Sequence, residues 1–264
     1  MPQSLQVEVH NAIAIVRLNR PEKRNALSFE LMRELVAVGK TLRGDRNLRA
    51  VILAGNGDAF CAGLDVAELG NGGNRFFVFK ELLKPSQSLF QRMALVWRGL
   101  PVPVIAAVHG SCVGGGLQLA LAADIRIATP SSQWSILEGR WGMVPDMGIT
   151  ATMKGLLRPD IAKELTMTAR MFDGRYAQEI GLVTHLADDP LAAAQRLAAE
   201  FAARSPDAVL AGKRVIDAMT HRSRRRALWL EKWWQLKLLV GKNSAVARKR
   251  AKLPETAWRP RQFD

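Results

Sequence analysis

The order of apolar and polar positions predicts a mixed α/β chain that begins with strands. Residues 7–15 alternate apolar with other residues in two short runs on either side of Asn11. This period of two is typical of a β-hairpin. Continuous apolar runs predict buried strands at 49–55, 102–108 and 123–128.

Helical periodicity first appears after Ser28. Apolar residues recur at Leu31, Leu35, Val38 and Leu42, which places them on one face of a helix. Because a serine hydroxyl accepts hydrogen bonds from the free amides of a first helical turn, Ser28 is the predicted N-cap.

From about Asp189 the pattern becomes helical. Two helices are predicted, the second with Ser205 as cap and Pro206 in its first turn. A third helix carries a stripe of large apolar residues, Trp229, Trp233, Leu236 and Val240. The stripe favours packing or a subunit contact over a ligand site. We expect an α/β body over 1–190 and a helical region over 191–264 for packing and oligomerisation. No low-complexity linker separates them, so close packing is expected.

Composition narrows the class of protein and the compartment in which we expect it. The chain has 264 residues, 48% apolar and 23% charged, which is ordinary for a soluble domain with a substantial core. We see no secretory signal and no apolar run of membrane-spanning length, and therefore expect a cytoplasmic protein. Two cysteines fit a reducing compartment, and four scattered histidines lack zinc-ligand spacing, so we expect no metal.

The formal charge of +14 indicates an anionic partner or a strongly solvated surface. A small polyphosphate ligand would need only a few of these charges. The densest basic run, 221–226, is more typical of a solvated face or a helix terminus than of a nucleic-acid site. We therefore do not expect nucleic acid as a partner.

Two glycine-rich corners, 60–65 and 110–116, follow buried strands and are the first candidates for chemistry. Glycines at a helix start allow close backbone approach and leave unpaired N–H groups at the positive end of the dipole. Such an end can hold a phosphate or a developing oxyanion. A Walker loop is poorly supported, because it needs a Lys-Ser/Thr pair after the glycines and Leu117 and Gln118 stand there, and no dinucleotide-binding fingerprint is present. Close helix packing alone would also explain the glycines.

Two acids stand in the segment "EGRWGMVPDMG", at Glu138 and Asp146. A surface loop with a turn aspartate is the simplest explanation. A continuous helix would hold residues eight apart about 12 Å from each other. Two glycines and a proline between the acids argue against a helix, so the loop could turn both into one pocket. With the Leu64 and Gly115 amides facing each other, donors and acids would together form an acyl-binding site.

Four segments then resemble, in order and separation, the signatures of the crotonase superfamily, the enoyl-CoA hydratase/isomerase family. They are "LNRPEKRNALS", "AFCAGLD", "AAVHGSCVGGGLQLALAADIRIA" and "EGRWGMVPDMG", and the ending "RPRQFD" fits as well. The resemblance covers essentially the whole chain. Its most specific part is "FCAGLD" together with "HGSCVGGG".

The resemblance implies an α/β fold, a spiral of β-β-α turns with a C-terminal helical trimerisation region, in a homo-trimer or hexamer. It implies an acyl-CoA thioester as substrate and no separate cofactor, since coenzyme A is part of the substrate. The thioester oxygen would sit between the Leu64 and Gly115 amides. Ala62, Asp65 and Val66 would lie along the adenine, mostly through backbone atoms.

The same resemblance places Arg24, with Lys23 or Arg20 nearby, at the phosphates of coenzyme A. Cys61 then needs no nucleophilic role and is interpreted as a small packing residue. The pocket for the acyl tail is expected in segment 69–84, the least predictable part of the chain.

The chain also departs from the hydratase pattern, in which two glutamates flank the substrate. Gln118 replaces the first, and an amide can orient a water or bind substrate but cannot take a proton. Glu138 retains the second. Asp146 stands where hydratases usually carry glycine and where the dienoyl-CoA isomerases carry aspartate. Those isomerases also carry an acid at the place of Gln118, so the match to them is partial.

We therefore favour a proton shuttle between Glu138 and Asp146, with isomerisation ahead of hydration of a trans-2-enoyl-CoA. A carboxyl buried in an apolar pocket has a raised pKa, which suits this role. Two alternatives stay open: a hydrolase or dehalogenase in which Asp146 attacks the substrate, and a non-catalytic member that binds RNA through 221–226.

Overall fold

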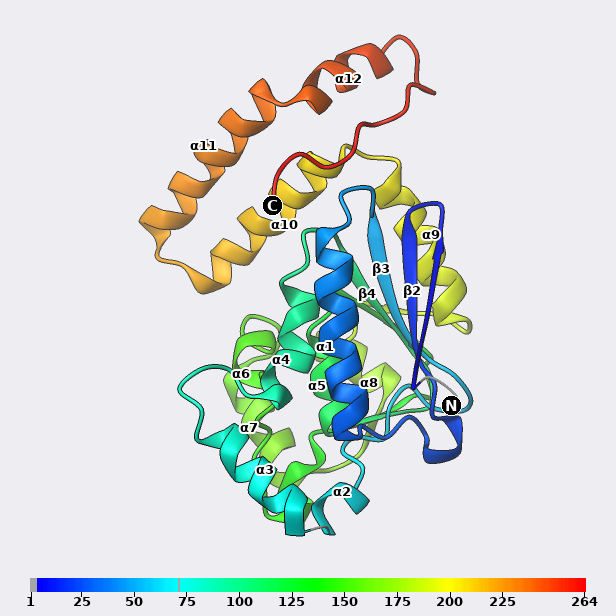
Figure 1. Cartoon of the computed structure of the whole chain (residues 1–264), viewed down its shortest axis with the longest axis vertical. Helices are drawn as coiled ribbons and strands as arrows, with labels where there is room; N and C mark the ends of the chain where they lie inside the picture. The colour runs from blue at the N-terminus through cyan, green and yellow to red at the C-terminus, as the bar shows by residue number, and fades with distance from the viewer. Residues whose placement is uncertain (1–3, 71) are drawn as a thin grey trace.

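A six-stranded sheet lies at the centre of the chain, whose computed structural model describes residues 4–70 and 72–264. Its order is β1-β2-β3-β4-β6-β9, with β1 antiparallel to β2 and the remaining neighbours parallel (Figure 1). The strands are β1 (Leu5–His10), β2 (Ile13–Leu18), β3 (Ala50–Gly55), β4 (Val104–Val108), β6 (Ile125–Ala128) and β9 (His185–Leu186). The three predicted buried strands are thus confirmed as β3, β4 and β6.

Two of the predictions involve residues outside the described part of the chain. The expected absence of a secretory signal involves residues 1–3, and the predicted tail-pocket segment includes residue 71. Within the described part of the chain, no helix is both long and apolar enough to cross a membrane.

The predicted hairpin is confirmed as β1 and β2. His10 pairs with Ile13, so the connection has two residues. Asn11 and Ala12 occupy it with φ of 50° and 63°, the left-handed conformation that tight hairpin turns require. Asparagine adopts this conformation readily and alanine does so at some cost.

A second, three-stranded sheet gives the chain its spiral course. It contains β5 (Ser111–Val113), β7 (Gln133–Ser135) and β8 (Phe172–Asp173). The chain passes from β4 to β5 to a helix, and then from β6 to β7 to a 3-10 helix. The preceding turn has a bridge from Cys61 to Cys112 of β5 in place of a full strand. These are successive β-β-α turns.

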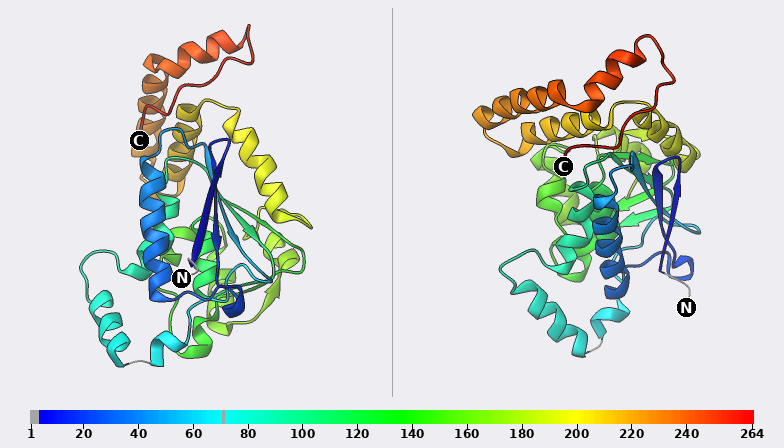
Figure 2. Two further views of the ribbon diagram at one scale, coloured as in Figure 1. Left: turned by 45° about the vertical axis from the view of Figure 1, so that its right-hand side comes forward. Right: turned by 45° about the horizontal axis from the view of Figure 1, so that its top comes forward.

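Helices cover both faces of the large sheet. α1 (Phe29–Gly44), α4 (Leu89–Arg98) and α5 (Gly115–Leu121) enclose the main core on one face, and α9 (Pro190–Ala202) lies on the other (Figure 2). Ser28 caps α1 as predicted, with its Oγ accepting from the Leu31 amide at 3.1 Å. The remaining elements are η1 (Pro21–Lys23), α2 (Ala67–Gly70), α3 (Gly72–Leu82), η2 (Leu137–Trp141), α6 (Ile149–Thr152), α7 (Pro159–Thr168) and α8 (Gly174–Glu179).

Three helices form the C-terminal region: α10 (Pro206–His221), α11 (Arg224–Val240) and α12 (Lys242–Arg250). α10 joins the body, because Lys213 contacts Asp124 at 2.7 Å and Arg98 contacts Asp217 at 3.2 Å. α11 and α12 stand away from the sheet (Figures 1 and 2). The division at residue 190 stays a prediction, although by its packing α9 belongs with the sheet.

The apolar stripe of α11 does not pack within the chain. The buried tryptophan of this helix is Trp234, which packs with Leu210 of α10. Trp229 and Trp233 stack on each other with ring centroids 5.6 Å apart, and both are exposed. Leu236 and Val240 are exposed as well. Of the two roles predicted for the stripe, internal packing is therefore wrong.

Candidate active site

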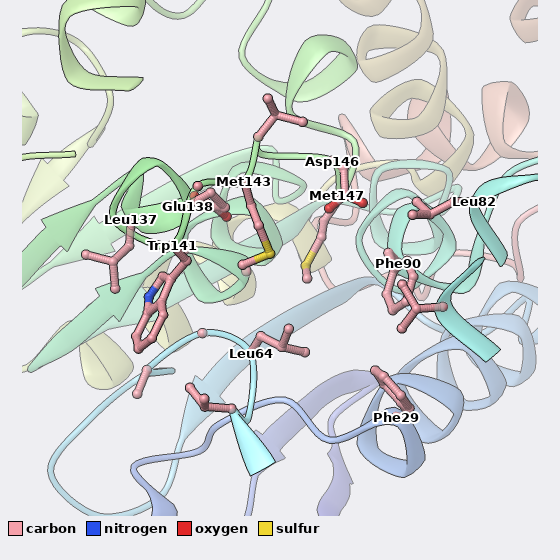
Figure 3. Close-up of a pocket in the computed structure, with 18 residues that line it drawn as sticks. Phe29, Leu64, Leu82, Phe90, Leu137, Glu138, Trp141, Met143, Asp146 and Met147 are labelled. Atoms are coloured by element: carbon pink, nitrogen blue, oxygen red, sulfur yellow. The ribbon is translucent and has the colours of Figure 1, made fainter. Parts of the chain in front are cut away.

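A cavity of about 520 Å³ opens between α3, α4, the 61–66 loop, the start of α5 and the segment from η2 to residue 147. Its walls are mainly apolar, with Phe29, Leu82, Phe90 and Met147 among them (Figure 3). Val78 and Leu82 come from α3. The size and apolar lining of this cavity suit an apolar chain.

The two glycine-rich corners meet at this cavity. The Val113 amide donates to the Cys61 carbonyl at 3.1 Å, and the Cys61 amide donates to the Ser111 carbonyl at 2.9 Å. This ladder places Leu64 and Gly115 together on the cavity lining. Among the described residues, neither the Leu64 nor the Gly115 amide has a hydrogen-bond acceptor. The pair of free donors expected from the sequence is therefore brought together.

Glycine is needed at this corner for two separate reasons. Gly114 has φ of 54° and ψ of −123°, a conformation that residues with a Cβ avoid. At Gly116, a Cβ would stand 2.5 Å from the Cys61 carbonyl oxygen. Both glycines hold α5 close enough to the 61–66 loop for the two amides to share the cavity.

Glu138 reaches the cavity from η2 and is only 8% exposed. Its Oε1 accepts a hydrogen bond from Gln118 Nε2 at 2.7 Å. Its Oε2 is buried and has no partner within the described part of the chain. Burial raises the pKa of Glu138, and the nearby charge of Asp146 raises it further. Hydrogen bonding from the Glu138 main chain and from Gln118 opposes this shift.

Asp146 lines the same cavity, which answers the question raised by the spacing of the two acids. The segment bends at Gly142 and Gly148, with φ of 66° and 95°, rather than continuing as a helix. Burial raises the pKa of Asp146. Figure 3 shows Glu138 near Leu137 and Asp146 toward the end of the pocket marked by Leu82 and Phe90.

Gln118 is placed differently from the substrate contact that the sequence predicts. Its side chain is fully buried behind Glu138 and does not line the cavity. Its Nε2 contacts Glu138, and its Oε1 accepts from the Met147 amide at 2.8 Å. The physical reason is local: α5 turns this residue toward the loop that carries both acids, where its polar atoms find partners.

Of the residues predicted at the coenzyme A side, some line the cavity and others lie outside its lining. Ala62 and Val66 line it, and the Ala62 amide donates to the Arg24 carbonyl at 2.9 Å. The Arg24 side chain is exposed. Asp65 does not line the cavity, because its carboxylate pairs with Arg20 at 2.9 Å.

Arg20 also donates to the Ala26 carbonyl at 2.6 Å. It therefore ties the 61–66 loop to the segment before α1. No local pattern pointed to the pair of Arg20 with Asp65, because the two residues are 45 positions apart.

Cys61 agrees with its interpretation as a packing residue. It is fully buried, and its Sγ donates to the Asn25 carbonyl at 3.1 Å. Burial raises the pKa of Cys61 to about 12, so the thiol stays protonated and is a poor nucleophile. Within residues 4–70 and 72–264, no group of three His, Cys, Asp or Glu side chains is arranged to hold a metal ion.

Comparison with known proteins gives consistent matches. A family model described as "Enoyl-CoA hydratase/isomerase" matches residues 8–242. The putative enoyl-CoA hydratase/isomerase YngF of Bacillus subtilis is 39% identical over 221 residues, 82% of this chain and 83% of that protein. Mitochondrial Delta(3,5)-Delta(2,4)-dienoyl-CoA isomerase of Mus musculus is 34% identical over 230 residues, 80% and 68% of the two chains.

The crystal structure of an enoyl-CoA hydratase from Bacillus anthracis superposes with a TM-score of 0.89. The two sequences are 28% identical, and the match covers 98% of this chain and 100% of that one. The predicted fold class, a crotonase-like α/β spiral with C-terminal helices, is thereby confirmed.

Proposed function

The chain belongs to the enoyl-CoA hydratase/isomerase family, and from this premise we propose that it relocates a proton on a bound enoyl- or dienoyl-CoA thioester, as an isomerase. The observation that carries the proposal is the placement of Glu138 and Asp146 at different points along one apolar cavity, beside two free backbone amides.

The proposed reaction begins at the thioester carbonyl. Removing a proton from a neighbouring carbon builds negative charge on the carbonyl oxygen. The Leu64 and Gly115 amides would donate to that oxygen and stabilise the enolate. Each such donor is worth about 100- to 1,000-fold in rate by analogy with other oxyanion holes. Neither amide has another acceptor to give up among the described residues.

The two acids would then handle the proton. Burial raises the pKa of both carboxyl groups, and the nearby charge of Asp146 raises that of Glu138 further, which suits these groups to exchange a proton. Because Asp146 lies nearer the end of the cavity at Leu82, it faces a different part of an acyl chain from Glu138. One acid can remove a proton at one carbon while the other returns a proton further along.

Hydration of a trans-2-enoyl-CoA is the second candidate function. It requires an activated water held beside the thioester, and the glutamate that helps to hold water in hydratases is replaced by Gln118. Both polar atoms of Gln118 already have protein partners. Glu138 and Asp146 would have to position the water between them, so isomerisation is favoured.

The remaining expectations concern assembly and surroundings. The exposed apolar stripe of α11 supports a homo-oligomer, trimer or hexamer, in which a neighbouring copy covers Trp229 and Trp233. Coenzyme A enters as part of the substrate, and no further cofactor is proposed. The cytoplasmic location stays a prediction.

The test is a panel of CoA thioesters assayed in deuterated water. It includes trans-2-enoyl, β,γ-enoyl and 3,5-dienoyl substrates of several chain lengths. Proton relocation predicts an isomeric product that carries deuterium and has gained no oxygen. A 3-hydroxyacyl product as the sole outcome would favour the hydratase, and no reaction with any thioester would contradict both.

A further inference from the structure

We propose that Gln118 is a positioning residue that directs the transferable proton of Glu138 onto Oε2, the oxygen without a partner in the described chain. The proposal rests on the acid/base role of Glu138 proposed above. It assigns to Gln118 a task that neither a substrate contact nor simple space-filling would give it.

The Met147 main chain fixes the direction of the Gln118 amide. A backbone N–H can only donate, so the Gln118 atom at 2.8 Å from it must be the carbonyl oxygen. The orientation of a glutamine amide is otherwise ambiguous, because its oxygen and nitrogen have nearly the same shape. Here a single unambiguous donor settles it, and the NH₂ group must face Glu138.

This orientation decides where Glu138 can carry a proton. The Gln118 NH₂ group donates to Oε1 at 2.7 Å and cannot accept there. In a neutral carboxyl the doubly bonded oxygen is the stronger acceptor, so the bond from Gln118 favours Oε1 as that oxygen. The same bond favours Oε2 as the oxygen that carries the proton of neutral Glu138. That oxygen is buried and without a partner in the described chain, as a group waiting for a substrate would be.

The same amide also holds the loop of the second acid. Met147 directly follows Asp146, and its amide hydrogen bond to Gln118 anchors that part of the loop. One side chain thus contacts the Glu138 carboxyl and the main chain next to Asp146. Gln118 fixes the spacing between the two acids along the pocket.

No basic side chain among the described residues competes with Gln118 for the Glu138 carboxyl. Asp146 is the charged group that acts on Glu138 from the facing loop, and its like charge raises the Glu138 pKa. Arg140 lies on the same 3-10 turn but donates to the Ala169 carbonyl at 3.1 Å. α5 contributes the neutral Gln118. Hydrogen bonding from the Glu138 main chain and from the Gln118 amide opposes the raised pKa of Glu138.

An acid at residue 118 would behave differently, and this gives a test. In a Gln118→Glu variant, one carboxyl oxygen would accept from the Met147 amide and the other would face Glu138 Oε1. Two carboxylates at that distance must share a proton. With the shared proton present, the new carboxyl donates to Oε1 and reproduces the native amide. Once that proton is lost, the two groups repel each other.

The experiment compares wild-type enzyme with Gln118→Met and Gln118→Glu on the best substrate of the panel. We measure kcat and KM over the pH range in which the protein is stable. Gln118→Met has nearly the same shape and no hydrogen bond, and should lower kcat about tenfold or more at every pH, with KM within about twofold. The kcat of Gln118→Glu should approach the wild-type value at acidic pH and fall as the pH rises. The wild-type pH profile should not show this additional fall.

A Gln118→Met variant with wild-type kcat and pH profile would overturn the proposal, as would a Gln118→Glu variant that never exceeds Gln118→Met. Glu138→Gln, assayed in parallel, distinguishes a failure of the proposed function from a failure of the proposed role of Gln118. If Glu138→Gln retains full turnover, the proposed function itself fails. If Glu138→Gln is inactive while Gln118→Met is unaffected, only the role of Gln118 is wrong. Retained CoA-thioester binding shows that each variant is folded.

Discussion

Replacing Glu138 with glutamine should abolish turnover while leaving the fold as stable as before or more so. The glutamine carbonyl can keep the hydrogen bond from Gln118, which is 2.7 Å long in the native protein. Its NH₂ group would take the place of Oε2, which already has no partner among the described residues. The substitution therefore adds no new unsatisfied group and changes only the capacity to exchange a proton.

The expected loss of rate follows from the loss of one acid/base group. Positioned general acids and bases contribute about 100- to 10,000-fold. This corresponds to about 3–5 kcal/mol in the activation free energy. Asp146 cannot substitute for Glu138, because it faces another part of the pocket. Substrate affinity should change little, since the apolar lining and the Leu64 and Gly115 amides are untouched.

The stability change has the opposite sign and depends on pH. Because burial raises the pKa of Glu138 above its ordinary value of 4.5, the folded protein holds this proton more firmly than the unfolded chain does. Wild-type stability therefore falls as pH rises from that value through the folded-state pKa. The glutamine variant does not show this fall in stability, because its side chain has no proton to lose in this pH range. Its free energy of unfolding should match wild type at acidic pH and equal or exceed it at neutral pH.

Two assays test the pair of expectations. Turnover is followed with the CoA-thioester panel, and the free energy of unfolding is measured by urea titration at acidic and neutral pH. A variant with more than a tenth of wild-type turnover would refute the acid/base role of Glu138. A variant that is clearly less stable than wild type at neutral pH would refute the burial argument.

Three further predictions address the corner, the tail pocket and the C-terminus. Gly116→Ala should destabilise the fold by about 1–3 kcal/mol in urea titration and lower kcat, because the added Cβ would stand 2.5 Å from the Cys61 carbonyl oxygen; unchanged stability and rate would contradict this. Leu82→Trp should raise KM for long-chain more than for short-chain thioesters, since Leu82 lines the cavity, whereas Leu83→Trp, at an 81% exposed residue, is the control with no such shift. Asp207→Ala should cost about 2–4 kcal/mol of unfolding free energy, because this carboxylate, 1% exposed, accepts from α12 and from two C-terminal amides; a loss below 1 kcal/mol would show that these bonds contribute little.

Local patterns predicted the elements that depend on neighbours in sequence. The hairpin followed from alternation around Asn11, and the start of α1 followed from Ser28 and the apolar spacing behind it. The two glycine corners pointed to free amides, because a helix start leaves its N–H groups unpaired wherever it lies. Such features need no knowledge of the tertiary fold.

Features that depend on distant partners could not be read in this way. Gln118 meets Glu138 and Met147, which are 20 and 29 positions away, so the pattern around Gln118 says nothing of either contact. Arg20 and Asp65 are 45 positions apart, so their contact could not be predicted from the local pattern either.

Amphipathic helices pose a related problem. The spacing in α11 identified an apolar stripe but not which face the rest of the chain would cover. Trp234 is buried, and its neighbour Trp233 is exposed. An apolar face predicts that something covers it, without saying whether the cover is the same chain or another copy.

The most direct measurement is a crystal structure of the protein with a slowly reacting or non-reacting enoyl-CoA analogue. We predict that the thioester oxygen accepts hydrogen bonds of about 3 Å from both the Leu64 and the Gly115 amides. We also expect Glu138 and Asp146 to contact different carbons of the acyl chain. A thioester oxygen away from both amides, or acyl carbons beyond reach of both carboxyl groups, would contradict these predictions.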